Sequence, residues 1–127
     1  MMQRGAETAP ASTSTTEFRR RFPLGSTSKV VLVDAAGRYA GIVETAKAFD
    51  VAVEPDAEVG TLGTLESIAL SPAQDVRSAI RTFDLSEADY LAVIDDNRSV
   101  LGTLSERFVH RRYADEVENA QREMFGE

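Results

Sequence analysis

The chain has 127 residues, 43% of them hydrophobic, which is enough for one compact domain with a buried core and excludes a disordered chain. Its formal net charge of −7 argues against nucleic acid as a partner, because phosphate binding depends on clustered Lys and Arg. The absence of cysteine excludes disulfides, thiol catalysis and thiolate metal sites.

The N-terminal region predicts a short strand and then a helix. Residues 1–12 show little periodicity, so we expect a flexible start with a short first strand around residues 7–9. Ser14 followed three residues later by Glu17 has the pattern of a capping box, in which the two side chains bond to backbone N–H groups at the start of a helix. A helix is therefore predicted over residues 15–22.

A β-hairpin is predicted over residues 30–43, VVLVDAAGRYAGIV, where two apolar runs rich in β-branched residues flank a turn. A similar stretch, LAVIDDNRSVLGTL, occupies residues 91–104. Gly41 and Gly102 are equivalent, and the spacing is 102 − 41 = 61 residues. The chain is therefore a duplicated unit with two hairpins.

The two hairpin turns differ in their residues. In the first copy, Asp34 and Gly37 occupy the positions that Asp and Gly favour in a type I turn. In the second copy, Asp95, Asp96 and Asn97 tolerate a left-handed backbone, so no glycine is needed. We expect the same turn geometry in both copies.

Between the hairpins the sequence predicts a short helix over residues 44–49, an acidic linker over 51–63 and a short strand over 67–70. Ser71 and Gln74, with a proline between them, have the pattern of a capped helix start. That helix carries an apolar stripe at helical spacing, formed by Val76, Ala79, Ile80 and Phe83.

The last predicted helix starts near Ser105 and extends to about Phe125. Its apolar stripe consists of Val109, Tyr113, Val117 and Met124. In one interpretation this helix covers its own domain or fills a dimer interface. In the other it contacts a separate effector region. We favour the first interpretation.

A β-α-β-β-α unit repeated at 61 residues, with a glycine and an apolar pair ending each hairpin, resembles the cystathionine β-synthase (CBS) domain. CBS domains occur as tandem pairs called Bateman modules. Within that family the chain is most similar to the C-terminal domain of bacterial ClC-type chloride channels and transporters. Three stretches carry this similarity: FRRRFPLGS at 18–26, GRYAGIV at 37–43 and RRYADEVENAQRE at 111–123.

The resemblance implies an α+β fold (an α/β sandwich) of two pseudo-twofold-related CBS repeats packed through their sheets. Repeat 1 would span 6–50, repeat 2 would span 64–113, and 114–127 would extend the last helix. The module would be a sensor and not an enzyme. It would form a homodimer and act on a membrane channel domain of the same polypeptide.

No apolar run in the sequence approaches the roughly 20 residues of a membrane helix, so we expect no membrane insertion of this chain. The resemblance then implies a cytoplasmic domain at the inner face of the membrane, excised from a channel or a stand-alone relative. The paired methionines at the N-terminus favour excision. Two alternatives remain open: a ligand-free dimerisation or docking module, and a stand-alone CBS pair that regulates another protein.

The resemblance also implies a regulatory ligand such as ATP, ADP or AMP, but this sequence departs from the nucleotide signature of the family. Glu44 stands where the first copy should have a Ser or Thr, and Lys47 stands where it should have the Asp that holds the ribose. In the second copy Phe108 replaces that Asp. Losing the carboxylate would weaken binding by roughly tenfold or more.

Five residues remain as candidate ligand contacts: Thr8, Ser26, Ser28, Gly102 and Ser105. Ser105 matches the hydroxyl position of the signature, but a Ser at the start of a helix is equally well explained as an N-cap. No cofactor is certain, and no catalytic pattern is present. His110 is the one histidine and has no His or Cys partner, so we expect a surface residue and no metal site.

Overall fold

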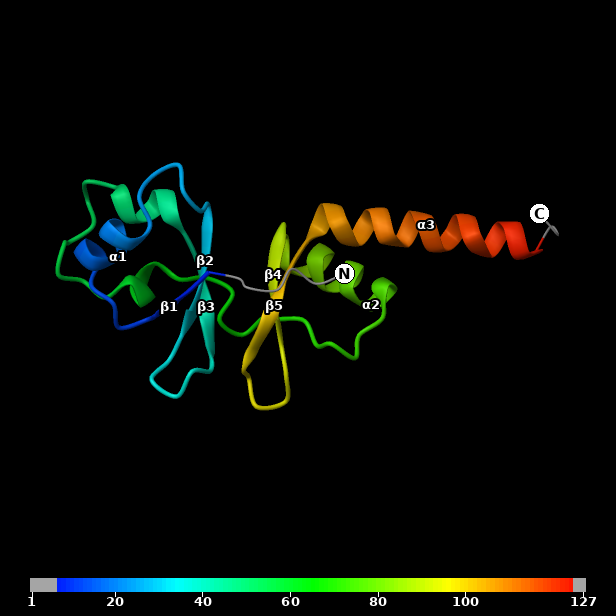
Figure 1. Ribbon diagram of the computed structural model, residues 1–127, viewed down its shortest axis with the longest axis horizontal. Coiled ribbons are helices and arrows are strands. Elements are labelled where there is room, and N and C mark those ends of the chain that lie inside the picture. The colour runs from blue at the N-terminus through cyan, green and yellow to red at the C-terminus, as the bar shows by residue number, and fades with distance from the viewer. Residues whose placement is uncertain (1–6, 125–127) are drawn as a thin grey trace.

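The structure, a computed structural model, describes the backbone of residues 7–124 and the side chains of residues 7–120. The rest of the predicted flexible start, the end of the predicted last helix and the Met124 side chain lie outside this range. The elements in chain order (Figure 1) are β1 (Thr8–Pro10), α1 (Thr15–Arg21), β2 (Lys29–Val33), β3 (Tyr39–Glu44), η1 (Thr45–Phe49), η2 (Val59–Leu62), α2 (Val76–Ser86), β4 (Tyr90–Ile94), β5 (Val100–Ser105) and α3 (Glu106–Met124).

The two predicted hairpins are present as β2–β3 and β4–β5, and they repeat in detail. Val30 pairs with Val43 in the first, and the residues 61 positions later, Leu91 and Leu104, pair in the second. Each hairpin contains one register shift, and the two shifts are equivalent: between Leu32 and Val33, and between Val93 and Ile94. The duplication therefore extends to the backbone irregularities.

A third strand position is also duplicated, but unequally. β1 lies parallel to β2, with Ala9 opposite Leu32. In the second repeat the equivalent residues, Leu70 and Val93, form an isolated parallel bridge. The strand predicted over residues 67–70 is thus reduced to a single bridging residue.

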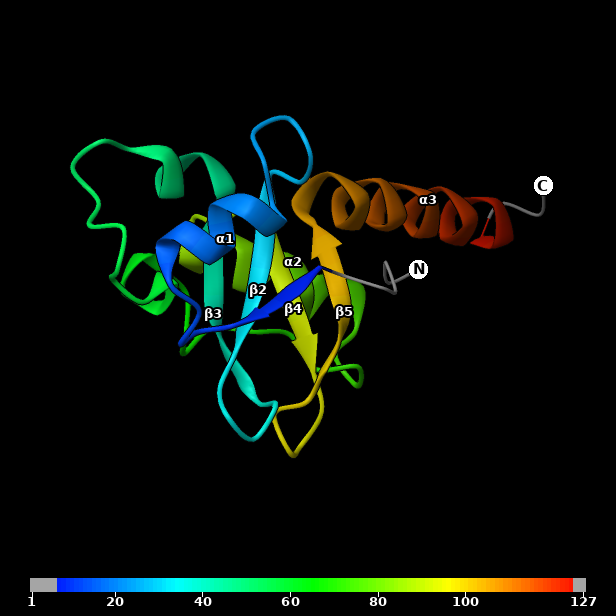
Figure 2. The ribbon, with the colours of Figure 1, turned by 60° about the vertical axis from the view of Figure 1, so that its left-hand side comes forward.

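The two sheets face each other, with α1 on the outer side of the first sheet and α2 and α3 on the outer side of the second (Figures 1 and 2). Successive strand residues point to opposite faces of a sheet. Val30 accordingly packs towards Phe18 of α1, whereas Val31 packs with Ala92 of the second sheet. The predicted packing of the two repeats through their sheets is confirmed.

The interface between the sheets also contains a buried hydrogen-bonding group, the hydroxyl of Tyr39. It donates to the carbonyl oxygens of Leu65, at 2.6 Å, and Ile68, at 3.2 Å. Burial raises the pKa of Tyr39 to about 12. The phenol therefore stays neutral and ties the first hairpin to the segment that enters the second repeat.

The two helix starts show where local sequence rules apply. Ser14 caps α1 as predicted, accepting a hydrogen bond from the Glu17 N–H, but the Glu17 carboxylate pairs with Arg20 and not with the backbone N–H that the capping box predicted. The start predicted for α2 is wrong, because Ser71 and Gln74 bond to each other's backbone within a turn. The helix begins later and is capped by Asp75.

The hairpin turns differ from the prediction at one residue. Gly37 has a positive φ of +80° in the first turn, and the equivalent residue of the second turn, Arg98, has φ +65°. The left-handed backbone that was predicted for Asp95, Asp96 or Asn97 is therefore found at Arg98. The aspartate that opens each turn instead accepts two backbone N–H bonds. Aspartate thus holds the turn, and the left-handed residue follows it.

Arg98 tolerates this backbone because it joins the two hairpins. Its carbonyl accepts the Tyr39 N–H at 2.7 Å, and its guanidinium donates to the carbonyls of Tyr39, at 2.9 Å, and Glu66, at 3.1 Å. We predict that Arg98→Ala lowers the free energy of unfolding by about 1–3 kcal/mol, because the bonds are lost and the strain remains. Arg98→Gly should recover roughly 1 kcal/mol of this loss. Urea unfolding of both variants measures the difference, and equal stabilities would contradict the assigned strain.

The acidic segment predicted as a linker packs on the first repeat. Val59 is fully buried in the hydrophobic core of the first repeat, with Phe18 and Val30, and its N–H donates to the Thr13 carbonyl. Ile42 and Thr64 exchange backbone hydrogen bonds in both directions at 2.8 Å. The segment therefore fixes where the chain enters the second repeat.

Helix α3 follows β5 directly and extends beyond α2 (Figure 1). Its predicted stripe fades along its length: Val109 is buried, Tyr113 is half-buried and Val117 is 38% exposed. Among the described residues, no helix combines the length and the apolar character that crossing a membrane requires.

Candidate ligand-binding cleft

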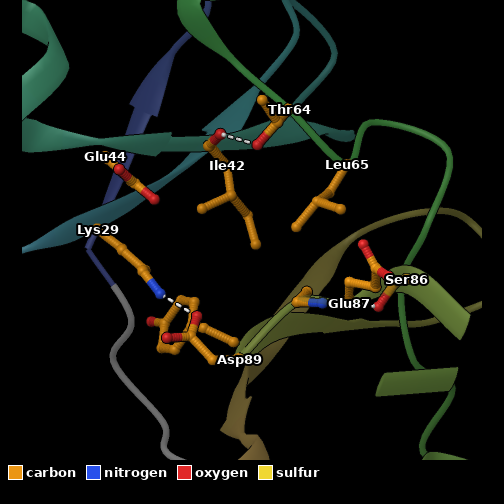
Figure 3. Close-up of a pocket in the computed structure, with 10 residues that line it drawn as sticks. Lys29, Ile42, Glu44, Thr64, Leu65, Ser86, Glu87 and Asp89 are labelled. Atoms are coloured by element: carbon orange, nitrogen blue, oxygen red, sulfur yellow. Dashed lines mark hydrogen bonds and ion pairs between the residues drawn. The ribbon is translucent and has the colours of Figure 1, made fainter. Parts of the chain in front are cut away.

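A hollow of about 420 Å³ lies between the two hairpins and is lined by both repeats (Figure 3). Ile42 and Leu65 form an apolar wall, and the side chains of Lys29 and Glu44 border its open side. The remaining lining residues come from the last residue of α2, the loop that follows it and the first residue of β4: Ser86, Glu87, Ala88, Asp89 and Tyr90, together with Thr64. Small-molecule sites combine apolar contacts with polar groups that orient the ligand, and this lining offers both.

Lys29 crosses this hollow from the first repeat to the second. Its ammonium forms an ion pair with Asp89 (Figure 3) and lies 5.4 Å from the centroid of the Tyr90 ring. The hydrogen bond from Lys29 holds the pKa of the Asp89 carboxyl below its usual range. The Lys29 side chain is 22% exposed and that of Asp89 is 75% exposed, so solvent and ligands can reach the pair.

The Lys29–Asp89 pair gives a prediction for stability against pH. A carboxyl whose pKa is lowered in the folded state stabilises above its unfolded pKa and loses this contribution as the pH falls through the folded value. Asp89→Asn should therefore cost at most about 1 kcal/mol at pH 7, the usual limit for exposed pairs. The cost should shrink as the pH falls below 3.8, the ordinary pKa of an Asp carboxyl. A deficit in urea unfolding that persists unchanged in acid would contradict the ionic origin of the effect.

A second hollow of about 380 Å³ adjoins the first, and Lys29 and Glu44 line both. Ser26 and Ser28, two of the residues predicted to contact a ligand, lie on its wall. The Ser26 hydroxyl donates to the Pro23 carbonyl at 2.5 Å. The structure thus brings two of the five predicted residues to one surface.

The other three predicted residues have structural positions away from the described hollows. Thr8 is exposed in β1, opposite Val31, and Gly102 is buried in β5. The Ser105 hydroxyl accepts the Phe108 N–H at 3.1 Å, so the N-cap interpretation explains this residue.

The sequence interpretation missed the acidic residues of the cleft, although a signal was present. Adding 61 to 26 and 28 gives 87 and 89, so Glu87 and Asp89 are the equivalents of Ser26 and Ser28. The loops before β2 and β4 meet at the first hollow. Applying the duplication to the candidate serines would have identified both carboxylates.

Comparison with known proteins identifies the fold. No protein-family model matches the chain, and no curated protein matches it in sequence. Solved structures do match. The CBS-pair domain of a protein described as a Mg²⁺ transporter from Shewanella oneidensis has a TM-score of 0.71 at 22% identity, covering 91% of this chain and 68% of that one. The chain has the fold of a CBS domain pair.

Two further matches support this fold. A CBS-pair and ACT-domain protein from Thermotoga maritima gives a TM-score of 0.72 at 17% identity, covering 91% of this chain and 93% of that one. The protein CBSX2, solved in complex with AMP, gives 0.71 at 16% identity, with coverages of 90% and 93%. The predicted α+β architecture of paired repeats is confirmed.

Within the CBS-pair fold, the two positions where the resemblance places a ribose-holding Asp have different surroundings. Lys47 is exposed on η1. Phe108 is half-buried and borders a small apolar hollow between α2 and α3, with Val76 and Ala79. Neither residue lines the two larger hollows. Glu44, which lies three residues before Lys47, lines both of these hollows.

Proposed function

We propose that the chain is a regulatory module that binds an adenosine-containing ligand in the hollow between its hairpins. The observation that carries the proposal is the lining: Lys29, Ile42 and Glu44 come from the first repeat, while Glu87 and Tyr90 come from the second. A ligand in this position contacts both repeats and so biases their arrangement, which is what a sensor requires. Similar structures solved with AMP and with ATP support the ligand class.

The lining favours the nucleoside part of such a ligand. Ile42 and Leu65 offer apolar contact to a base, and both point into the hollow (Figure 3). The exposed carboxylate of Glu44 is placed to accept hydrogen bonds from a ribose diol. It would take over the role of the carboxylate that is absent at position 47.

Charge favours a ligand with few phosphates. Among the described residues that line the hollow, Lys29 is the one cation and Glu44, Glu87 and Asp89 are carboxylates, a balance of 1 − 3 = −2. A triphosphate would meet net repulsion, whereas a monophosphate needs one cation. Lys29 can supply that charge by exchanging Asp89 for the phosphate. We therefore expect affinity to fall in the order AMP, ADP, ATP.

Calorimetric titration with AMP, ATP and adenosine tests the proposal. Lys29→Ala should weaken AMP binding by roughly tenfold or more, the value of a charge-assisted hydrogen bond. Adenosine binding should change by less than about twofold, because the nucleoside makes no phosphate contact. Lys47→Ala is the matched control, since this lysine is exposed and outside the hollows. No heat and no thermal stabilisation at millimolar AMP or adenosine would refute the sensor.

We propose further that the parent protein is a membrane transporter of the ClC type, with this module on its cytoplasmic side. The three stretches at 18–26, 37–43 and 111–123 support the ClC assignment. The similarity to the domain of a protein described as a Mg²⁺ transporter supports a membrane-transport setting. The full reading frame tests this, because a ClC-type parent must encode a run of membrane helices upstream.

A homodimer through α3 is proposed alongside this role. Tyr113 and Val117 border a groove with Val76 near the start of α2, and the C-terminal part of α3 continues beyond α2 (Figure 1). A second copy would cover this apolar edge. Light scattering of a chain that lacks residues 114–127 should show a loss of dimer with the fold retained, and an unchanged dimer would exclude α3 as the interface.

A further inference from the structure

Three side chains that can bind a metal converge where α3 begins. Glu106 and His110 are four residues apart on α3 and so share one face of the helix. Asp84 lies near the end of α2. One ligand atom from each of the three lies within 4.8 Å of the others. The cluster is separate from the cleft lining, and the lack of other His or Cys in the sequence had concealed it.

The hydrophobic core fixes the two helices that carry these groups. Phe83, the neighbour of Asp84 in α2, is fully buried, and Val109, the neighbour of His110 in α3, is 4% exposed. Both belong to the same core cluster. The backbone on each side of the cluster is therefore held in place, and only side-chain rotation is free.

The three side chains are available for a ligand. In the described part of the chain, none of them makes a hydrogen bond or ion pair through its side chain. Asp84 and His110 are exposed and Glu106 is half-buried. Two carboxylates thus lie close together without a cation, and a bound cation would remove their mutual repulsion.

We propose that Asp84, Glu106 and His110 bind a divalent transition-metal cation of the zinc type. One imidazole and two carboxylates suit Zn²⁺, Co²⁺ or Mn²⁺, whereas Mg²⁺ and Ca²⁺ prefer oxygen ligands alone. Zinc bonds of about 2.0–2.2 Å require the ligand atoms to approach to roughly 3.5 Å. Rotation of the exposed side chains supplies the remaining contraction.

The site would connect α3 to the ligand cleft. The Glu106 N–H donates to the Asp89 carbonyl at 2.9 Å, and the Asp89 carboxylate pairs with Lys29 in the first hollow. Glu106 therefore lies one residue contact away from the cleft, and a backbone hydrogen bond joins the two sites. The metal site stands on its own geometry and does not depend on the proposed nucleotide.

Calorimetry and cobalt spectroscopy on tag-free protein test the site. We expect one Zn²⁺ per chain, a rise in melting temperature, and Co²⁺ bands in the visible spectrum. His110→Ala and Asp84→Asn should each weaken Zn²⁺ binding at least tenfold. As the one histidine of the chain, His110 should also show a shifted imidazole resonance on Zn²⁺ addition.

The controls distinguish binding at this site from nonspecific attraction of cations to an acidic chain. Asp115→Asn removes an exposed carboxylate of α3 outside the cluster and should leave Zn²⁺ affinity unchanged. Mg²⁺ should produce no comparable stabilisation. No Zn²⁺ binding at millimolar concentration would overturn the proposal, and so would binding that His110→Ala and Asp84→Asn leave intact. Circular dichroism of the metal-free variants verifies that they fold.

Discussion

The Val31→Asp variant is expected to lose its folded state under conditions in which the natural chain is fully folded. Val31 is fully buried between the two sheets, packed with Tyr39, Ile42 and Ala92. Among these core neighbours no charged side chain is present to pair with a new carboxylate. The cost of an unpaired buried charge, added to the lost apolar burial, is about 4 kcal/mol or more. That approaches the whole stability of a small domain, about 5–15 kcal/mol.

Val51→Asp is the matched control, because it makes the same chemical change at a valine that is 100% exposed. Its free energy of unfolding should differ from that of the natural chain by no more than about 0.5 kcal/mol. Thermal unfolding followed by circular dichroism measures both variants. A cooperative melt of Val31→Asp near the natural temperature would show that the sheets do not pack through this residue.

The duplication made most of the fold predictable. Continuous apolar runs such as residues 30–33, bounded by turn residues, predict strands that are buried on both faces. The same pattern 61 residues later, as in Val30 and Leu91, therefore predicted the same hairpin with the same register. Packing through the sheets followed from the family resemblance.

The wrong predictions share a physical cause. The Gln74 side chain accepts the Ser71 N–H as in a capping box, but the Ser71 hydroxyl accepts the Ala73 N–H, and these local bonds stabilise a turn that does not continue as a helix. The left-handed Arg98 depends on distant partners, Tyr39 in the other repeat and Glu66 at the start of its own. Local sequence contains no information on such distant contacts.

The candidate site was the least predictable part for the same reason. Ser26 and Ser28 were identified because they precede a hairpin, but Asp89 becomes relevant because Lys29 reaches it across 60 residues. The Asp84, Glu106 and His110 cluster needs the packing of α2 against α3. Sites formed between elements require the fold before they can be recognised.

Gly41→Ala is expected to produce the second largest effect, a loss of about 2–4 kcal/mol in the free energy of unfolding. Gly41 has φ +129°, a backbone conformation that other residues rarely adopt. A Cβ at this position would also lie 3.0 Å from the Thr64 carbonyl oxygen. That carbonyl accepts the Ile42 N–H at 2.8 Å, so moving it away breaks the bond that joins β3 to the second repeat.

Gly37→Ala separates the two contributions in Gly41→Ala. Gly37 has φ +80°, but a Cβ there would meet no atom within 4 Å. Gly37→Ala should lower the free energy of unfolding by about 1 kcal/mol, which is the cost of the left-handed backbone alone. The excess measured for Gly41→Ala in urea unfolding then reports the contact with Thr64 together with the greater backbone strain at φ +129°. Since that contact sets where the chain enters the second repeat, Gly41→Ala should also weaken AMP binding in the adjacent cleft, while Gly37→Ala should not. Equal losses in the two variants would show that the close approach to Thr64 contributes nothing.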